Sequence, residues 1–213
     1  MLSTEATDYD VVIIGAGLTG LSLACWLEEL ARDYEGSMPR VCLLEPRTRY
    51  SNDRTWCFWD SGDHPFRDLI THRWSYWQVS AHGHDARQSN EKAPYALLPS
   101  DALYRHAQQC INHCPALSMR MGVRADRVEE HAGGVEVATE NGEALITRTV
   151  VDTRPPSAQQ LNSRIGLWQA FTGFEIHCSN HGYNVSTARL MDFQLSDDTC
   201  CFVYLLPKDE HHL

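Results

Sequence analysis

A short apolar strand followed by three spaced glycines constrains this chain more than any other feature. Asp10–Ile14 is β-branched and apolar, which is typical of a strand buried on both faces. Gly15, Gly17 and Gly20 follow it in the spacing G-x-G-x-x-G. The first glycine permits a tight turn, the second lets backbone approach a pyrophosphate, and the third lets a helix pack closely on the strand. The pattern predicts a phosphate-binding turn at a helix N-terminus.

The residues after the turn complete a β-α-β unit. Leu18–Leu30 has the apolar spacing of a helix, and Val41–Leu44 is a second short apolar run. The crossover between them implies parallel strands. Glu45 ends the second strand, where a carboxylate accepts hydrogen bonds from ribose hydroxyls and disfavours a 2′-phosphate. NAD and FAD therefore both fit, NADP does not, and glycines that serve only a tight turn are the alternative.

The cofactor contacts expected from this unit lie in the turn, the first helical residues and the acid, namely Gly15, Ala16, Gly17, Leu18, Thr19, Gly20 and Glu45. An N-terminal unit of this kind, followed by a β-meander over Arg127–Asp152, resembles two-domain flavoproteins more than simple dehydrogenases. The resemblance favours FAD. In the meander, Asn141-Gly142 is a strong hairpin signal.

Composition excludes several classes of function. With 18 basic and 28 acidic residues the net charge is −10, so no nucleic-acid partner is expected. The N-terminus lacks the pattern of a signal peptide, and the longest apolar run, Val11–Leu18, is too short to span a bilayer. We expect a cytoplasmic protein, with peripheral attachment to a membrane surface left open.

The chain has eight cysteines, and two of them, Cys110 and Cys114, flank His113. No second group of ligands with a matching spacing occurs elsewhere in the sequence, so no metal site is predicted.

The rest of the chain predicts an α/β protein with a β-rich second part. We expect a Rossmann-like FAD/NAD(P)-binding domain at 1–156, with an irregular aromatic-rich insertion at about 46–95, and a partial substrate-binding domain at 157–213. Ser100 begins a helix that continues over Ala102–His113, and Pro155–Ser163 is a linker. Pro46–Asp68 is predicted to be irregular. Three further strands are predicted, at Trp74–His82, Gly166–Glu175 and Cys201–Leu206.

Five segments, spread in order along the chain, resemble the bacterial-type lycopene β-cyclase family. They are the opening fingerprint, an aromatic loop after the second strand and three later motifs: Val11–Gly20, Asn52–Trp59, Gln169–Gly173, Leu190–Phe193 and Phe202–Pro207. The resemblance implies FAD, held reduced during catalysis, with NAD(P)H as a reductant. It also implies a linear carotene substrate such as lycopene, whose end groups close to β-ionone rings without net redox change. Cofactor contacts are then expected from three residues of the loop, Arg54, Thr55 and Trp56.

Two departures from the family pattern qualify this interpretation. The family's usual proton donor is expected beyond Leu213, so we expect the chain to be incomplete and to bind FAD more weakly than the whole protein. Asp192 is the best acidic candidate within the chain, and a structural carboxylate paired with an arginine is its alternative. Pro155 stands where the family has a glycine, which places local cofactor contact in doubt. The competing functions are another FAD-dependent enzyme, such as a hydroxylase or isoprenoid reductase, and a non-catalytic nucleotide-binding fragment.

Overall fold

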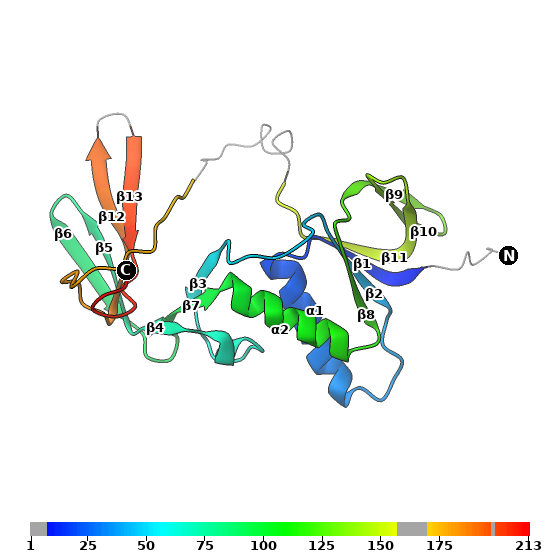
Figure 1. Cartoon of the computed structure of the whole chain (residues 1–213), viewed down its shortest axis with the longest axis horizontal. Helices are drawn as coiled ribbons and strands as arrows, with labels where there is room; N and C mark the ends of the chain where they lie inside the picture. Colours follow the sequence, from blue (N-terminus) through cyan, green and yellow to red (C-terminus); the bar gives the residue numbers. More distant parts are fainter. Residues whose placement is uncertain (1–7, 157–169, 197–198) are drawn as a thin grey trace. The chain divides into compact units, whose positions relative to one another are not determined.

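The computed structural model describes residues 8–156, 170–196 and 199–213 and divides the chain into two compact units (Figure 1). The first unit comprises Met1–Asp53 and Ser100–Gly166, and the second comprises Arg54–Pro99 and Leu167–Leu213. Each unit therefore draws on two separate stretches of sequence. Most of the expected insertion at 46–95 contributes to the second unit, together with the C-terminal segment.

The first unit is built on a six-stranded sheet in the order β8-β2-β1-β11-β10-β9. The strands β8, β2, β1 and β11 run parallel, whereas β9, β10 and β11 form an antiparallel meander. Their bounds are β1 Tyr9–Ile14, β2 Val41–Glu45, β8 Leu117–Met121, β9 Ala125–His131, β10 Gly134–Thr139 and β11 Ala144–Asp152. The β-α-β unit and the meander predicted from the sequence are both confirmed.

Two helices belong to the first unit, α1 (Leu18–Asp33) and α2 (Ser100–His113), and they pack against each other (Figure 1). The buried residues of α1 include Leu21 together with Ala24 and Cys25, which follow it by three and four positions and so lie on the same face. The predicted helix start at Ser100 is confirmed. Within the described residues, no helix combines the length and apolar character needed to cross a bilayer.

The second unit contains two sheets. One has the order β13-β12-β5-β6 and the other has the order β3-β7-β4. Their bounds are β3 Thr55–Trp59, β4 His72–Trp74, β5 Tyr76–Ala81, β6 His84–Ser89, β7 Tyr95–Pro99, β12 Thr187–Ser196 and β13 Thr199–Leu205, with a short 3₁₀ helix at Arg67–Leu69.

The core of the second unit joins residues that lie far apart in sequence. Strands β5 and β12 pair in parallel, with Tyr76 opposite Thr187. Trp74, Leu97 and Leu190 are buried in one cluster. The indole Nε1 of Trp74, which is fully buried, donates a hydrogen bond of 2.7 Å to the carbonyl oxygen of Pro207. This cluster ties the segment around residue 74 to the segments around 190 and 207.

Several sequence predictions fail in this unit. Pro46–Asp68 is not wholly irregular, because Thr55–Trp59 is strand β3 and pairs with β7. The predicted strand Gly166–Glu175 is wrong over its described part, since residues 170–175 form no strand. Residues 166–169 of that strand, and residues 157–163 of the predicted linker, lie outside the described residues. The predicted strand at Cys201–Leu206 corresponds to β13.

Candidate functional site

The glycine turn of the first unit is held by backbone and hydroxyl contacts. Gly15 has φ +96°, a backbone conformation that residues other than glycine rarely adopt. Its N–H donates a 2.9 Å hydrogen bond to Leu44 on β2. The Thr153 Oγ1 atom lies 2.9 Å from the Ile14 carbonyl oxygen and 3.0 Å from that of Gly15. The end of β11 therefore fixes the turn that follows β1, a contact that the glycine spacing alone did not reveal.

The N-terminus of α1 is open where the turn enters it. A Cβ atom built on Gly17 meets no heavy atom within 4 Å, whereas one on Gly20 would lie 2.0 Å from the Gly15 carbonyl oxygen. Gly17 is the N-cap residue, no side chain caps the helix, and its first turn carries no acid. Backbone N–H groups and the positive end of the helix dipole are thus available to an anion. Gly20 serves helix packing, and Gly17 leaves space for a ligand.

Glu45 lies buried at the end of β2 and reaches the glycine turn. Its Oε2 accepts a 3.0 Å hydrogen bond from the N–H of Ala16, and its Oε1 accepts one of 2.8 Å from Arg47 Nε. Burial alone would raise the pKa of this carboxyl, but the bonds from Arg47 and Ala16 outweigh it and hold the pKa below its usual value. A ribose that used Glu45 would have to share the carboxylate with Arg47 or displace it.

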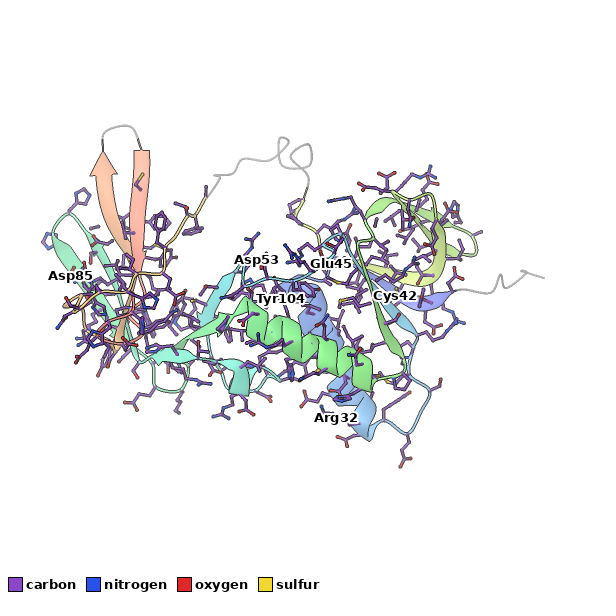
Figure 2. The ribbon with its side chains drawn as sticks, viewed as in Figure 1. Arg32, Cys42, Glu45, Asp53, Asp85 and Tyr104 are labelled. Carbon is purple, nitrogen blue, oxygen red and sulfur yellow. The ribbon has the colours of Figure 1, made fainter. Side chains whose placement is uncertain are left out.

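Arg47 is the centre of a polar cluster that sequence reasoning missed. Its guanidinium carbon lies 4.8 Å from the ring centre of Tyr50 and 5.3 Å from that of Tyr104. Nη1 of Arg47 donates to the Tyr104 hydroxyl at 3.0 Å, and that hydroxyl donates to Asp53 at 2.9 Å. Figure 2 labels Glu45, Asp53 and Tyr104, which this chain of contacts joins. Stacked rings fix the cation beside the glycine turn.

These features of the first unit fit a dinucleotide. The open space at Gly17 and the uncapped start of α1 suit a pyrophosphate, and the site lies at the carboxyl ends of β1 and β2. The structure joins Glu45 to Ala16, which follows Gly15 in the turn, and Leu18, Thr19 and Gly20 are the first residues of α1. At the end of β11, Arg154 pairs with Asp152 at 2.7 Å and donates to the Ala125 carbonyl oxygen.

The remaining expected cofactor contacts belong to the second unit. Arg54 is exposed and directly precedes β3. Thr55 and Trp56 lie in β3, opposite Pro99 and Leu98 of β7. They are placed by strand pairing within the second unit, so their contact with a cofactor remains a prediction.

Asp192, the acidic candidate, lies on β12 in the second unit. Its Oδ2 is 3.6 Å from Nη1 of Arg189, so the structure shows the arginine pairing that was its structural alternative. Asp192 also lines a hollow of about 430 Å³ beside the β5–β6 turn, together with Asp85 and Phe193. The residue is thus both paired and accessible, and its catalytic role stays a prediction.

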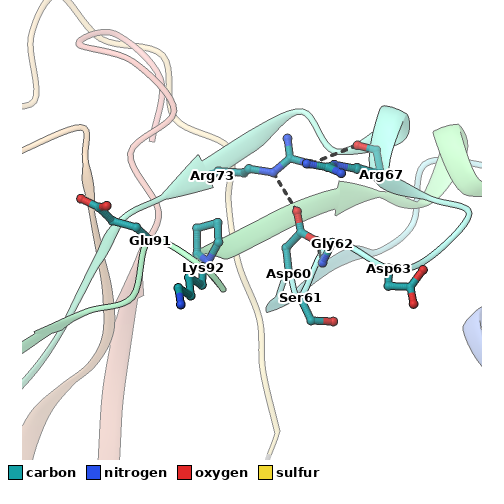
Figure 3. Close-up of a pocket in the computed structure, with 9 residues that line it drawn as sticks. Asp60, Ser61, Gly62, Asp63, Arg67, Arg73, Glu91 and Lys92 are labelled. Carbon is teal, nitrogen blue, oxygen red and sulfur yellow. Dashed lines mark hydrogen bonds and ion pairs between the residues drawn. The ribbon is translucent and has the colours of Figure 1, made fainter.

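A second hollow of about 440 Å³ lies around Asp60 in the same unit (Figure 3). The buried carboxylate of Asp60 accepts hydrogen bonds from Arg73 Nε at 2.8 Å and from the N–H of Gly62 at 2.8 Å, and it contacts His64 at 2.9 Å. Burial would raise the pKa of Asp60, but these contacts outweigh it and lower the pKa. Arg67 and Lys92 also line this hollow, which makes it a poor site for an apolar substrate.

An aromatic row crosses β12, β13 and the segment before them. Its members are Phe171, Phe193, Phe202 and Tyr204. The ring centres of neighbouring members lie 5.5 to 5.7 Å apart. Phe171 is 61% exposed, so the row reaches the surface of the second unit. Such a surface can contact an apolar molecule through ring faces.

Comparison with solved structures finds a similar fold in several proteins, one of them described as a probable FAD-dependent monooxygenase. PqsL of Pseudomonas aeruginosa, described as a probable FAD-dependent monooxygenase, is 17% identical, with a TM-score of 0.66 over 96% of this chain. The p-nitrophenol 4-monooxygenase PnpA of Pseudomonas putida is 16% identical, with a TM-score of 0.63 over 95% of the chain and 56% of its own. A geranylgeranyl bacteriochlorophyll reductase-like protein of Thermoplasma acidophilum is 15% identical, with a TM-score of 0.62 over 96% of the chain and 54% of its own. The predicted α/β fold with a Rossmann-like FAD/NAD(P)-binding domain is confirmed.

The chain spans 59% of the length of PqsL. No curated protein matches its sequence. The model of the family described as lycopene cyclase protein matches residues 10–213. This match includes the glycine turn, Glu45, the aromatic loop and the aromatic row. The chain therefore belongs to the lycopene cyclase family.

Proposed function

We propose that this chain belongs to an enzyme that closes the ends of lycopene to β-ionone rings, using FAD without net oxidation or reduction. The observation that carries the proposal is the match to the lycopene cyclase family over residues 10–213. The glycine turn supports it, because Gly17 and the open start of α1 leave room for the pyrophosphate of a dinucleotide. PqsL, which has a similar fold and is described as a probable FAD-dependent monooxygenase, supports the same cofactor.

In this proposal, the first unit holds the adenine half of FAD. Backbone N–H groups at the start of α1 bind the pyrophosphate, with Gly15, Ala16 and Gly17 forming the turn. Glu45 accepts the ribose hydroxyls once Arg47 turns toward a phosphate, and Arg54, Thr55 and Trp56 are further residues that we propose as cofactor contacts. The cofactor, reduced by NAD(P)H, supplies negative charge that stabilises a positively charged substrate.

The second unit contacts the carotene. Cyclisation needs an acid that protonates the terminal double bond, and ring closure then follows by attack of a neighbouring double bond on the carbocation. The cyclised cation then loses one proton to give the β-ionone ring, so no net proton is consumed. The aromatic row offers ring faces that attract a cation and exclude water. Asp192 is the acid that we propose within this chain, since it lines an open hollow together with Phe193 of the row. The exposed end of the row at Phe171 suits contact with a membrane surface where a linear carotene dissolves.

Conversion of lycopene tests the proposal. The full-length gene product is purified, supplied with lycopene in lipid vesicles, FAD and NADPH under anaerobic conditions, and the pigments are separated by chromatography. We expect β-carotene or its one-ringed precursor, with less than one NADPH consumed per ring, because the reaction is an isomerisation. A protein that binds FAD but leaves lycopene unchanged would contradict cyclisation.

A second function is favoured by the similarity in fold to two monooxygenases and a reductase-like protein. A hydroxylase or isoprenoid reductase consumes one NAD(P)H for each product molecule and changes the product's mass. The same incubation, repeated in air because a hydroxylase needs O₂, therefore distinguishes them, since cyclisation leaves the mass of lycopene unchanged. An oxygenated or hydrogenated product would assign this second function to the chain.

A further inference from the structure

Two thiols and an imidazole converge between α1 and α2 in the first unit. Cys25 comes from α1, whereas His106 and Cys110 lie four residues apart on α2, and their ligand atoms all lie within 4.8 Å of one another. Cys25 and Cys110 are buried, and His106 is half-buried. Residues four apart on a helix project from one face, which is the spacing by which helices present paired metal ligands. The packing of α1 on α2 adds the third ligand.

The distances suit a tetrahedral metal ion. Nε2 of His106 lies 3.5 Å from Sγ of Cys110. In a tetrahedral zinc site with Zn–S of about 2.3 Å and Zn–N of about 2.0–2.1 Å, these two atoms are about 3.5 Å apart. A disulfide between Cys25 and Cys110 would not account for the position of the His106 imidazole beside the two sulfur atoms.

We propose that Cys25, His106 and Cys110 bind one Zn²⁺ ion, with a water molecule as the fourth ligand, and that the ion joins α1 to α2. Thiolate and imidazole are the ligands that zinc prefers. Binding replaces the two thiol protons, which pass to solvent, so the charges of two thiolates and one Zn²⁺ cancel. The site joins the two helices of the first unit, α1 and α2, which pack against each other (Figure 1).

The neighbouring acid does not complete the ligand set. Glu28 follows Cys25 by one helical turn and is 7% exposed. Both of its oxygens accept hydrogen bonds from Arg32, at 3.0 and 2.8 Å. This ion pair is neutral overall and keeps the carboxylate occupied, which leaves the fourth position to water. The sequence had indicated no metal site because Cys110, His113 and Cys114 lack a partner motif, and the helix crossing supplies a different set.

Cobalt substitution tests the site in the full chain. The protein is reduced with a phosphine, treated with a chelator, and titrated with Co²⁺ and then Zn²⁺. We expect one equivalent of Co²⁺ to produce thiolate-to-cobalt absorption in the near ultraviolet and the intense visible bands of four-coordinate Co²⁺. One equivalent of Zn²⁺ should abolish both and raise the Tm. Absence of these bands from the freshly reduced chain overturns the proposal, even if Cys25 and Cys110 later form a disulfide.

Matched variants separate this site from other cysteines and histidines. Cys25→Ser, Cys110→Ser and His106→Asn should each weaken Co²⁺ binding at least tenfold. His113→Asn, at an exposed position on the same helix, and Cys114→Ser, at a buried position just beyond it, should bind as the native chain does. Circular dichroism checks that each variant folds, and the half-buried His106 provides a variant that leaves both buried thiols intact. Loss of the bands in His113→Asn or Cys114→Ser, with retention in His106→Asn, overturns the assignment.

Discussion

Oε2 of Glu45 lies 3.0 Å from the backbone nitrogen of Ala16, so the acid that ends β2 holds the turn that follows β1. The same carboxylate accepts three hydrogen bonds from Arg47, one from its backbone and two from its side chain. One buried charge therefore organises the glycine turn and the cation beside it. Both contacts are expected to affect stability as well as nucleotide binding.

Glu45→Gln should destabilise the first unit by about 1–3 kcal/mol at pH 7, because Arg47 loses its charged partner in a buried setting. The pKa of Glu45 is lowered by folding, so its contribution is present above the unfolded pKa and is lost as the pH falls through the folded value. The stability difference between native protein and variant should therefore shrink below about pH 4.5. Denaturant unfolding at several pH values measures it. A difference that stays constant from pH 7 to pH 3 would disprove this role.

Gly20→Ala should destabilise the chain by about 1–3 kcal/mol or more, because the added methyl would lie 2.0 Å from the Gly15 carbonyl oxygen. Gly17→Ala is the matched control for folding, since its methyl meets nothing within 4 Å and φ is −86°. Gly17→Ala should keep stability within about 1 kcal/mol. If the pyrophosphate lies there, it should weaken FAD binding at least tenfold. Thermal unfolding and flavin fluorescence quenching measure the two effects, and equal stability of the two variants would contradict the packing role of Gly20.

Trp74→Phe should weaken the second unit by about 1–3 kcal/mol, because the buried Pro207 carbonyl loses its hydrogen bond and the smaller ring leaves space. Hydrogen exchange followed by mass spectrometry should show faster exchange in β5 and β12 and little change in β1. Trp26→Phe is the control, at a position on α1 that is 43% exposed. Unchanged exchange in β12 would show that the Trp74 contact does not hold this sheet.

Asp192→Asn should lower conversion of lycopene by the full-length protein by about 10²-fold or more, if this carboxyl is the proton donor. Asp85→Asn is the control, because Asp85 lines the same hollow and is exposed. Product formation is measured with FAD binding, which neither variant should change. Wild-type rates for Asp192→Asn would assign Asp192 to its ion pair with Arg189 alone.

Local patterns in the sequence predicted the first unit well. The strand–glycine–helix series and the Asn141-Gly142 hairpin are encoded by neighbouring residues, and both formed as expected. Strands β6 and β12 were not predicted, because strand formation in these segments depends on the strands with which they pair. All six residues of β6 are exposed, so it carries no apolar alternation, and β12 pairs with β5 from more than a hundred residues away.

The residues of the candidate site likewise divide into those that local sequence patterns predict and those that depend on tertiary packing. The glycines and Glu45 could be found from spacing, because the β-α-β unit fixes their geometry. Arg47, Tyr104 and Thr153 could not, since their contacts depend on how α2 and β11 pack around the turn. The cluster of Cys25, His106 and Cys110 depends likewise on the crossing of two helices, which no short motif specifies.

The strand pairing also sets an order of events during synthesis. Strand β1 leaves the ribosome before β11, its neighbour in the sheet, which pairs with it only after Asp152 has been translated. Strand β5 likewise waits for β12. Until then each of these two strands exposes an unpaired edge, through which nascent chains can pair with one another and aggregate. Slow translation or chaperone binding while these edges are unpaired should therefore influence the yield of folded protein.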